Sequence, residues 1–300
     1  MQTFSDVHSS VREFTGRYWS IISSRQVGAG RYLYPPFPDN VSRNFAKIKG
    51  QPVAPGEVFS ACSTSLFTTG SKGYILTDDC LYSSKHGRIP YTAAADLQVA
   101  FSLDRREDKV KFSGAAKYGD VVLNDLYDAG AAVVAQDYYR RLCSRNFDIT
   151  DQDIDDLIRP RLAGFDGTLT YSNFGSLTLI SLCGLRPGES VLGTSKDLLF
   201  TNERLFRLEH GSVAEYFNYT DVKYIQLSKY RTRVRLDMLG AALKEAAKLL
   251  ISFVDSVSTS SNIKVKVANW RTFDLLNVAA EEADEVVKAA ARAGVEIRKA

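Results

Sequence analysis

The sequence contains few cysteines, no long apolar run and no secretory signal. Its four cysteines, Cys62, Cys80, Cys143 and Cys183, lie far apart and form no CxxC pair. We therefore expect reduced thiols, with neither a zinc site nor a disulfide framework. No apolar run reaches the roughly 18 residues that a membrane-spanning helix needs, and the N-terminal stretch lacks the basic and apolar segments of a signal peptide. These absences predict a cytoplasmic protein without a bound metal or cofactor.

The chain also lacks a strong excess of either charge. Its 38 lysines and arginines against 35 acidic residues give a net charge of +3, which is too small to indicate a nucleic-acid partner. Hydrophobic residues make up 45% and charged residues 24%, an ordinary globular composition. Because 300 residues exceed what one compact core usually holds, we expect two domains.

Apolar residues near the N-terminus follow a spacing of three and four. The stripe predicts an amphipathic helix and comprises Phe4, Val7, Val11, Phe14, Tyr18 and Ile21. It spans fewer than three heptads, so docking on the chain's own fold is favoured over a dimer seam. The prolines of "YPPFPDN" (Tyr34 to Asn40) then predict an extended connector.

The rest of the chain alternates between strand-like and helical patterns. The patterns predict strands over 55–119, 176–185, 187–236 and 262–270, and helices over 124–145, 239–256 and 277–294. Asn124 is the expected N-cap of the first of these helices, and Gly294 the expected stop of the last. Residues 148–162 are acidic and predict a short helix that ends before Pro160.

One stretch of the sequence is repeated. "ILTDDCLYSSKHG" (Ile75 to Gly87) and "LFTNERLFRLEHG" (Leu199 to Gly211) share a threonine, a leucine and a terminal His-Gly at a constant offset of 124 residues. Upstream, "PGE" at 55–57 recurs at 187–189, and downstream the Tyr-Thr pair at 91–92 recurs at 219–220. The two copies therefore predict related units, each a meander of short strands followed by an amphipathic helix that covers the open sheet.

The second copy carries a recognisable signature. Leu199 to Ile225 resembles the motif of pleckstrin-homology-like (PH-like) domains, particularly the bacterial PH-like and GRAM-type families, and the matching residues are Thr201, Asn202, Arg204, Tyr219, Asp221 and Ile225. The first copy is a weaker match, with Cys80 in place of the arginine and Ala93 in place of the aspartate. The resemblance implies an α+β fold of two tandem, partly open antiparallel β-barrels, each closed by a C-terminal helix, after an N-terminal helical extension.

This resemblance suggests a division of the chain into four parts. Residues 1–50 form the N-terminal helix and Pro-rich connector, 51–147 the first PH-like domain, 148–186 an acidic connector and strand, and 187–300 the second PH-like domain.

Several polar clusters have ordinary structural explanations. Asn202, Glu203 and Arg204 suit a turn between strands, and His86 and His210 precede glycines at expected hairpin turns. "GFDGTLTYSN" (164–173) lacks the paired aspartates of a phosphotransferase loop, and the acidic run from Asp151 lacks the glycine and glutamate of a calcium loop. No set of nucleophile, base and orienting group is evident, so an enzyme is not expected.

The candidate binding site is a basic stretch, "SKYRTRVRL" (228–236). In a strand, alternate side chains share a face, so Lys229, Arg231, Arg233 and Arg235 would form one basic stripe. Such a row could recognise acidic lipid headgroups or an acidic protein surface, or it could be a solvated edge whose charges prevent aggregation.

The sequence therefore predicts a non-catalytic binding or scaffold protein. Its expected partners are another protein or a second copy of the chain, with an anionic membrane surface as a peripheral alternative. The stretch 239–256 could pack on the sheet or at a dimer interface, or lie as an amphipathic helix on a membrane. An enzyme with a site between the domains is the least favoured alternative.

Overall fold

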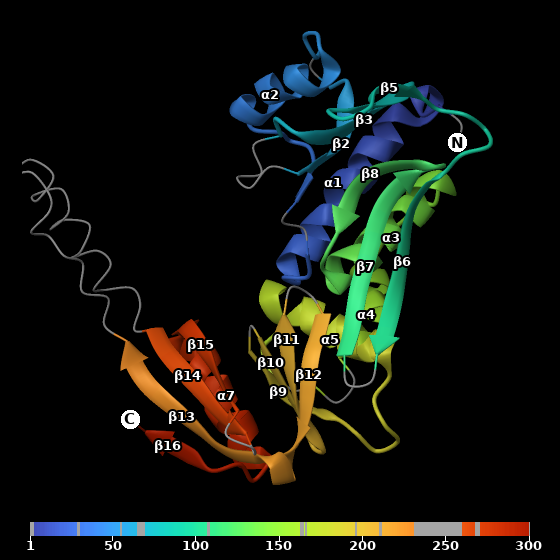
Figure 1. Ribbon diagram of the computed structural model, residues 1–300. Coiled ribbons are helices and arrows are strands. Elements are labelled where there is room, and N and C mark those ends of the chain that lie inside the picture. The colour runs from blue at the N-terminus through green and yellow to red at the C-terminus, as the bar shows by residue number, and fades with distance from the viewer. Residues whose placement is uncertain are drawn as a thin grey trace, which may run out of the picture. The chain divides into compact units, whose positions relative to one another are not determined.

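The computed structural model describes residues 3–28, 31–54, 56–64, 70–106, 109–162, 165, 167–195, 197–209, 212–230, 260–267 and 271–299 (Figure 1). The chain divides into two compact units, which are described separately. Unit 1 comprises Met1–Ala163, Thr168–Gly184 and His210–Ser212, and unit 2 comprises Gly164–Gly167, Leu185–Glu209 and Val213–Ala300.

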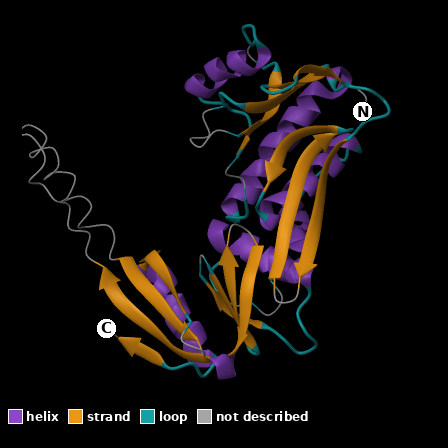
Figure 2. Ribbon diagram, viewed as in Figure 1, coloured by secondary structure: helices purple, strands orange, loops and turns teal. Residues whose placement is uncertain are grey.

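Both units combine helices with antiparallel strands (Figure 2). This confirms the predicted α+β class. None of the sheets formed by the described residues closes into a barrel.

Unit 1 begins with the predicted amphipathic helix. A single 3-10 turn, η1 (Ser5–Val7), leads into α1 (His8–Ser24). The part of the predicted stripe that lies in α1 is buried together with Trp19 and Ile22, whereas Val7, in η1, is half-buried. The stripe packs on α3 (Ala129–Cys143): Phe14 stacks on Tyr138 with ring centroids 5.7 Å apart, and the Tyr18 hydroxyl donates to the Val134 carbonyl at 2.9 Å. The helix thus docks on its own chain, as the sequence favoured.

A second helix follows the proline-rich connector and was not expected. After β1 (Tyr32–Leu33), the helix α2 (Asp39–Lys49) begins directly behind Pro38 and ends at Gly50, which has a φ of +78°. Its buried side chains, Val41, Phe45 and Ile48, pack against the first strand meander. The prolines therefore all precede α2 in the sequence, and none interrupts it.

The strands of unit 1 form two antiparallel groups. The first comprises β2 (Val58–Ser63), β3 (Gly73–Thr77), β4 (Cys80–Ser83) and β5 (Gly87–Pro90), with β1 paired to β2. The second comprises β6 (Leu97–Arg106), β7 (Lys109–Tyr118) and β8 (Val121–Leu126), with β7 in the middle.

Helix α3 begins later than predicted. Asn124 belongs to β8, so it is not the N-cap, and Asp128 caps the helix instead by accepting from the Ala131 amide at 2.6 Å. The acidic stretch beyond α3 is α4 (Asp151–Ile158), which ends before Pro160 as predicted and continues as the 3-10 turn η2 (Arg159–Arg161). Thr150 and Asp153 form a capping box at its start, which confirms the helix-start interpretation over a calcium loop.

The predicted strand at 176–185 is wrong, because this segment belongs to helix α5 (Tyr171–Cys183). A capping box between Thr170 and Asn173 starts the helix, and Gly184 follows its end with a φ of +80°. A run that is apolar on all sides gives no periodicity that separates a buried helix from a buried strand. The local capping signals, rather than the apolar run, decide between the two.

The described part of unit 2 contains two groups of strands and a helix. Four antiparallel strands, β9 (Val191–Thr194), β10 (Leu198–Thr201), β11 (Arg204–Glu209) and β12 (Ser212–Asn218), are followed by the turn η3 (Tyr219–Asp221). A second sheet has the order β15 (Thr272–Ala279), β14 (Ser260–Val267), β13 (Val222–Tyr230) and β16 (Ile297–Lys299), in which β16 runs parallel to β13.

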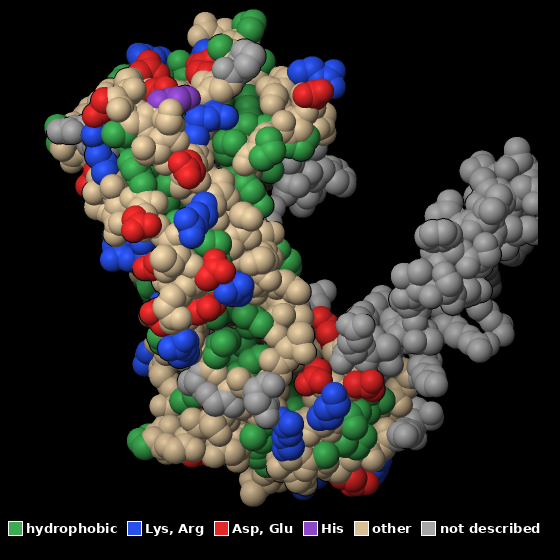
Figure 3. Space-filling model, turned by 180° about the vertical axis from the view of Figure 1, so that it is seen from behind, with side chains coloured by type: hydrophobic (Ala, Val, Ile, Leu, Met, Phe, Trp, Pro, Cys, Tyr) green, Lys and Arg blue, Asp and Glu red, His purple; other side chains and the backbone are tan. Residues whose placement is uncertain are grey.

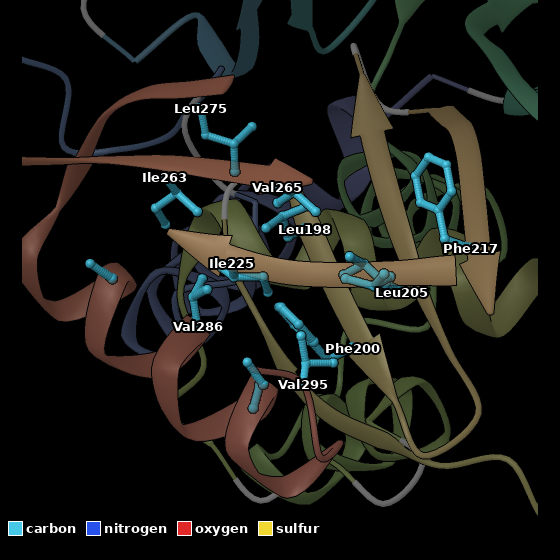
Figure 4. Packing of buried hydrophobic residues seen from close by; sticks show 14 of the residues in the cluster. Leu198, Phe200, Leu205, Phe217, Ile225, Ile263, Val265, Leu275, Val286 and Val295 are labelled. Carbon is cyan, nitrogen blue, oxygen red and sulfur yellow. The ribbon is translucent and has the colours of Figure 1, made fainter. Parts of the chain in front are cut away.

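Helix α7 (Ala280–Arg292) covers the core of unit 2 and ends before Gly294, the predicted stop, which has a φ of +71°. Figure 4 shows side chains from β10, β11, β13 and β14 converging with those of the helix. Alternation along β14 puts Ile263, Val265 and Val267 in this core, while Lys264 is exposed. The core therefore draws on both strand groups of unit 2 and on its closing helix.

Candidate functional site

The predicted basic stripe begins at the end of a described strand. Lys229 lies in β13 opposite Ser261 of β14, so the chain enters the basic stretch as a paired strand. The side chain of Lys229, together with Arg231, Arg233 and Arg235, lies outside the described residues, and so does the predicted helix 239–256. The basic stripe remains a prediction.

The repeated sequence forms the same hairpin twice. In unit 1, Ile75 pairs with Tyr82 and Leu76 with Leu81. In unit 2, Leu199 pairs with Phe206 and Phe200 with Leu205. Each residue of the second hairpin stands 124 positions after its counterpart, so the sequence repeat corresponds to a shared strand register.

The strand before each hairpin carries a bulge at the same place. The pairs Val58↔Thr77 and Ser60↔Leu76 leave Phe59 as the extra residue in unit 1. The pairs Val191↔Thr201 and Gly193↔Phe200 leave Leu192 as the extra residue in unit 2. A bulge at one position of a ladder is a specific structural feature, so its recurrence extends the likeness of the two copies beyond the hairpin.

The repeated "PGE" is a turn that needs its glycine and uses its glutamate. Gly56 and Gly188 have φ values of +84° and +81°, a region that favours glycine. Glu57 accepts from the Ala54 amide and Glu189 from the Arg186 amide, each at 2.9 Å. In each copy, the glutamate therefore stabilises a turn just before the first strand.

The threonine and tyrosine that recur in both copies are also structural. The Thr77 hydroxyl donates to the Cys80 carbonyl at 2.8 Å, and the Thr201 hydroxyl donates to the Arg204 carbonyl at 3.0 Å. The Tyr91 hydroxyl donates to the Thr77 carbonyl at 3.0 Å, and Tyr219 makes the equivalent bond to Thr201. These bonds tie the hairpin turn to the chain that follows it.

The polar cluster of the second copy is a turn, as predicted. Asn202 accepts from the Ser190 amide at 2.8 Å and donates to the Gly188 carbonyl at 2.9 Å. Arg204 points back into the fold, where its guanidinium lies 4.6 Å from the centroid of the Phe206 ring. The cluster is therefore part of the scaffold.

Sequence reasoning missed the partner of Arg204. Its Nε and Nη2 donate to the two carboxylate oxygens of Glu189, both at 2.9 Å, and the Glu189 side chain has no exposed surface. Burial acts to raise the pKa of Glu189, but hydrogen bonds from Arg204, the Arg186 amide and Thr201 outweigh it and hold that pKa below its usual value. The repeated glutamate of "PGE" was the available signal for this pair.

The first copy keeps the glutamate but replaces the arginine with Cys80. A cation still reaches the site, because Lys49 at the end of α2 forms an ion pair with Glu57. The glutamate of the first copy is thus paired with a cation from another part of the chain.

The histidines do not form a shared site in the part of the chain that is described. His86 contacts the Val122 carbonyl at 2.9 Å, and His8 contacts Asp78 at 2.7 Å, while His210 lies outside the described residues. Across the described residues, no group of three His, Cys, Asp or Glu side chains is arranged to hold a metal ion.

A cavity in unit 1 has a volume of about 690 Å³. Its walls are the start of β6, one face of α3 and the end of α4 with η2. Arg140, Arg161, Gln98 and Gln136 supply polar groups to the lining. Two smaller cavities of about 430 and 280 Å³ lie beside α2 and beside Tyr32.

Charged side chains of both signs are interspersed on the face shown in Figure 3. Within the described residues of that face, no broad field of one sign is visible. The described helices include none that is long and apolar enough to cross a membrane.

No protein-family model matches the chain, and no curated protein matches it.

Proposed function

We propose that this chain is a non-catalytic binding protein built from two tandem PH-like domains, residues 51–147 and 187–300, which attaches to anionic lipid headgroups through Lys229, Arg231, Arg233 and Arg235. One observation carries the proposal. The signature segment forms the same hairpin, with the same bulge before it, in both copies.

The order of elements supports the PH-like assignment. Among the described residues, the first copy has the strands β2–β5, the strands β6–β8 and then helix α3, and the second has β9–β12, β13–β15 and then helix α7. A strand meander followed by a C-terminal helix is the order that the sequence resemblance implies. In unit 2 this helix buries Val286, Ala289 and Ala290 in the core.

The motif residues have structural roles, so we expect the binding site to lie outside the motif. Thr201, Arg204 and Tyr219 are engaged in hydrogen bonds within the fold, and their counterparts Thr77 and Tyr91 are engaged in the same way. Because these shared residues stabilise the fold in both copies, we expect a ligand to be bound by residues that only one copy has. The basic stretch that begins at the end of β13 is the clearest such feature of the second copy.

Electrostatics gives the expected strength of the attachment. A lysine or arginine near an anionic membrane contributes about 1 kcal/mol, so four cations supply roughly 4 kcal/mol. Such binding is weak, reversible and strongly reduced by salt, because exposed charges are screened within a Debye length of about 8 Å at physiological ionic strength.

Sedimentation with vesicles of phosphatidylserine and phosphatidylcholine tests the proposal. The variant Arg231→Glu, Arg233→Glu should lose binding by at least about 30-fold, since removal of two cations alone costs roughly 2 kcal/mol. The matched control is Lys223→Glu, Lys264→Glu, which changes the net charge equally at two exposed positions on β13 and β14. The control should retain most of the binding.

Two outcomes would contradict the proposal. Wild-type protein that stays in the supernatant at low salt has no membrane affinity, and equal losses in both double variants would show a general charge effect. A mass that rises with concentration on a sizing column, without vesicle binding, would favour self-assembly instead.

A further inference from the structure

We infer that the 690 Å³ cavity of unit 1 is a binding site for a small organic anion, a phosphate or carboxylate on an apolar body, held between Arg161 and Arg140. This inference is independent of the membrane proposal, which concerns a different domain.

The cavity has the size and lining of a small-molecule site. Its volume lies within the range of roughly 300 to 1,000 Å³ that is typical of ligand pockets. Leu97, Val99, Val133 and Leu157 supply apolar walls, and Gln98 and Gln136 supply amides. A ligand with one polar end and an apolar body would match this mixture.

Arg161 is the unusual group in the lining. Its Nη1 donates to the Leu157 carbonyl, but its Nε is buried without a hydrogen-bond acceptor among the described residues. Burial lowers the pKa of this arginine, and only the charge of Asp137 opposes that effect. A buried Nε–H without an acceptor is costly unless a ligand supplies one.

Asp137 does not fill this role. Its carboxylate already accepts from the Tyr18 hydroxyl at 3.1 Å, from Arg141 Nε at 3.1 Å and from Arg140 Nη2. None of these hydrogen bonds comes from Arg161, whose Nε has no acceptor among the described residues. An anionic ligand in the cavity would supply one.

Arg140 supplies the second cation of the site. Its side chain is 71% exposed, and one of its amino groups bonds Asp137 while the remaining donors stay available to a ligand. A planar guanidinium suits the paired oxygens of a carboxylate or phosphate. The exposed carboxylate of Asp96 also lines the cavity and disfavours polyanions, which restricts the ligand to a single anionic group.

Calorimetric titration of the full chain with phenyl phosphate and with benzoate tests the site, and neutral benzyl alcohol serves as the comparison. We expect saturable binding of at least one of the anions and none of the alcohol. Arg161→Met and Arg140→Gln should each weaken binding by about 10-fold, as expected for loss of a charged hydrogen bond. Arg88→Gln, an exposed arginine of unit 1 that pairs with Asp79, is the matched control and should bind as wild type does.

Thermal unfolding separates a binding role from a structural one. Without ligand, Arg161→Met should melt at the wild-type temperature or higher, because a buried donor without an acceptor has been removed. Phenyl phosphate should raise the melting temperature of wild type and of Arg88→Gln, but not that of Arg161→Met. If Arg161→Met fails to fold, the affinity of Arg140→Gln, altered only at an exposed side chain, decides the question.

Absence of saturable binding by wild type at millimolar phenyl phosphate and benzoate would overturn the inference. Unchanged affinity in Arg140→Gln would do the same, since the anion would then bind without the second cation.

Discussion

Glu189 and Arg204 are joined by two parallel hydrogen bonds, each 2.9 Å long, within unit 2. The pair links the turn before β9 to the first residue of β11, and only 11% of the Arg204 side chain is exposed. Two charges taken out of water stabilise a fold only while both are present, because loss of one leaves the other buried and unpaired.

The first prediction concerns this pair. Glu189→Gln should lower the free energy of unfolding by roughly 3 to 5 kcal/mol, since Arg204 keeps its charge and loses its counter-ion. Urea denaturation measures the loss. Glu203→Gln is the control, because Glu203 pairs with Arg186 at 3.3 Å near the surface, and it should cost less than about 1 kcal/mol. Equal effects of the two changes would contradict a special role of the buried pair.

The same pair predicts a dependence on pH. The pKa of Glu189 is lower in the folded chain than in the unfolded chain, so its contribution to stability is fully present above the unfolded value of about 4.3. The contribution is lost as the pH falls through the lower, folded value. The difference in melting temperature between wild type and Glu189→Gln should therefore be constant near neutrality and shrink below about pH 4.

Two neighbouring arginines on α3 provide the second prediction. Arg140 and Arg141 both donate to Asp137, but their side chains are 71% and 10% exposed. Arg141 also reaches Asp153 of α4 at 3.2 Å. Arg141→Ala should lower the free energy of unfolding by roughly 3 to 5 kcal/mol, and Arg140→Ala should lower it by less than about 1 kcal/mol. Urea denaturation of the two variants checks the contrast, and a reversed order would contradict it.

The third prediction tests how closely α7 approaches β9. A Cβ added at Gly193 would lie 2.7 Å from the Cβ of Ala289, which is too close for two carbon atoms. Gly193→Ala should therefore destabilise the chain by about 1 to 3 kcal/mol through overpacking.

The double variant Gly193→Ala, Ala289→Gly is the matched test of that contact. It removes the clashing methyl group from the helix, and glycine in place of alanine lowers the stability of the helix by about 1 kcal/mol. It should be more stable than the sum of the single changes predicts, as measured by a double-mutant cycle in urea. Strict additivity would show that the two residues do not touch.

Cysteine reactivity provides the fourth prediction. Burial raises the pKa of Cys62 to about 12 and that of Cys143 to about 11. Relative to an ordinary thiol of pKa about 8.5, the thiolate fraction at pH 8 falls by roughly 10³-fold for Cys62 and 10²-fold for Cys143. Iodoacetamide should label both slowly in the folded chain and rapidly in urea, as followed by peptide mass spectrometry. Labelling of folded Cys62 at the rate of a free thiol would contradict its burial.

Helix positions could be predicted where one face alone is apolar. The stripe from Val11 to Ile21 has the helical period because its other side meets water, and α1 buries that stripe. Helix α5 was missed because its apolar residues occur on every side, which removes the periodic signal. The Thr170 and Asn173 capping box carried the missing information.

The contacts of the candidate sites were less predictable than the elements. Glu189 belongs to the repeated "PGE" and Arg204 to the signature segment, and their contact depends on how the turn folds over the hairpin. The cavity at Arg161 likewise joins β6, α3 and η2, which are far apart in the sequence. Local patterns give no such long-range contact. The basic stripe begins at Lys229 in β13, but its other residues lie outside the described part of the chain, so the stripe still awaits a test.

The bulge shared by β2 and β9 has a consequence for protein engineering. The bulge fixes the register in which each strand pairs with its hairpin. The two copies can therefore differ in length only in the segments outside these paired strands. Residues 64–72 connect β2 to β3, whereas only 195–197 connect β9 to β10. The 64–72 connection is therefore the place where an inserted tag or a deletion is expected to leave the paired strands in register.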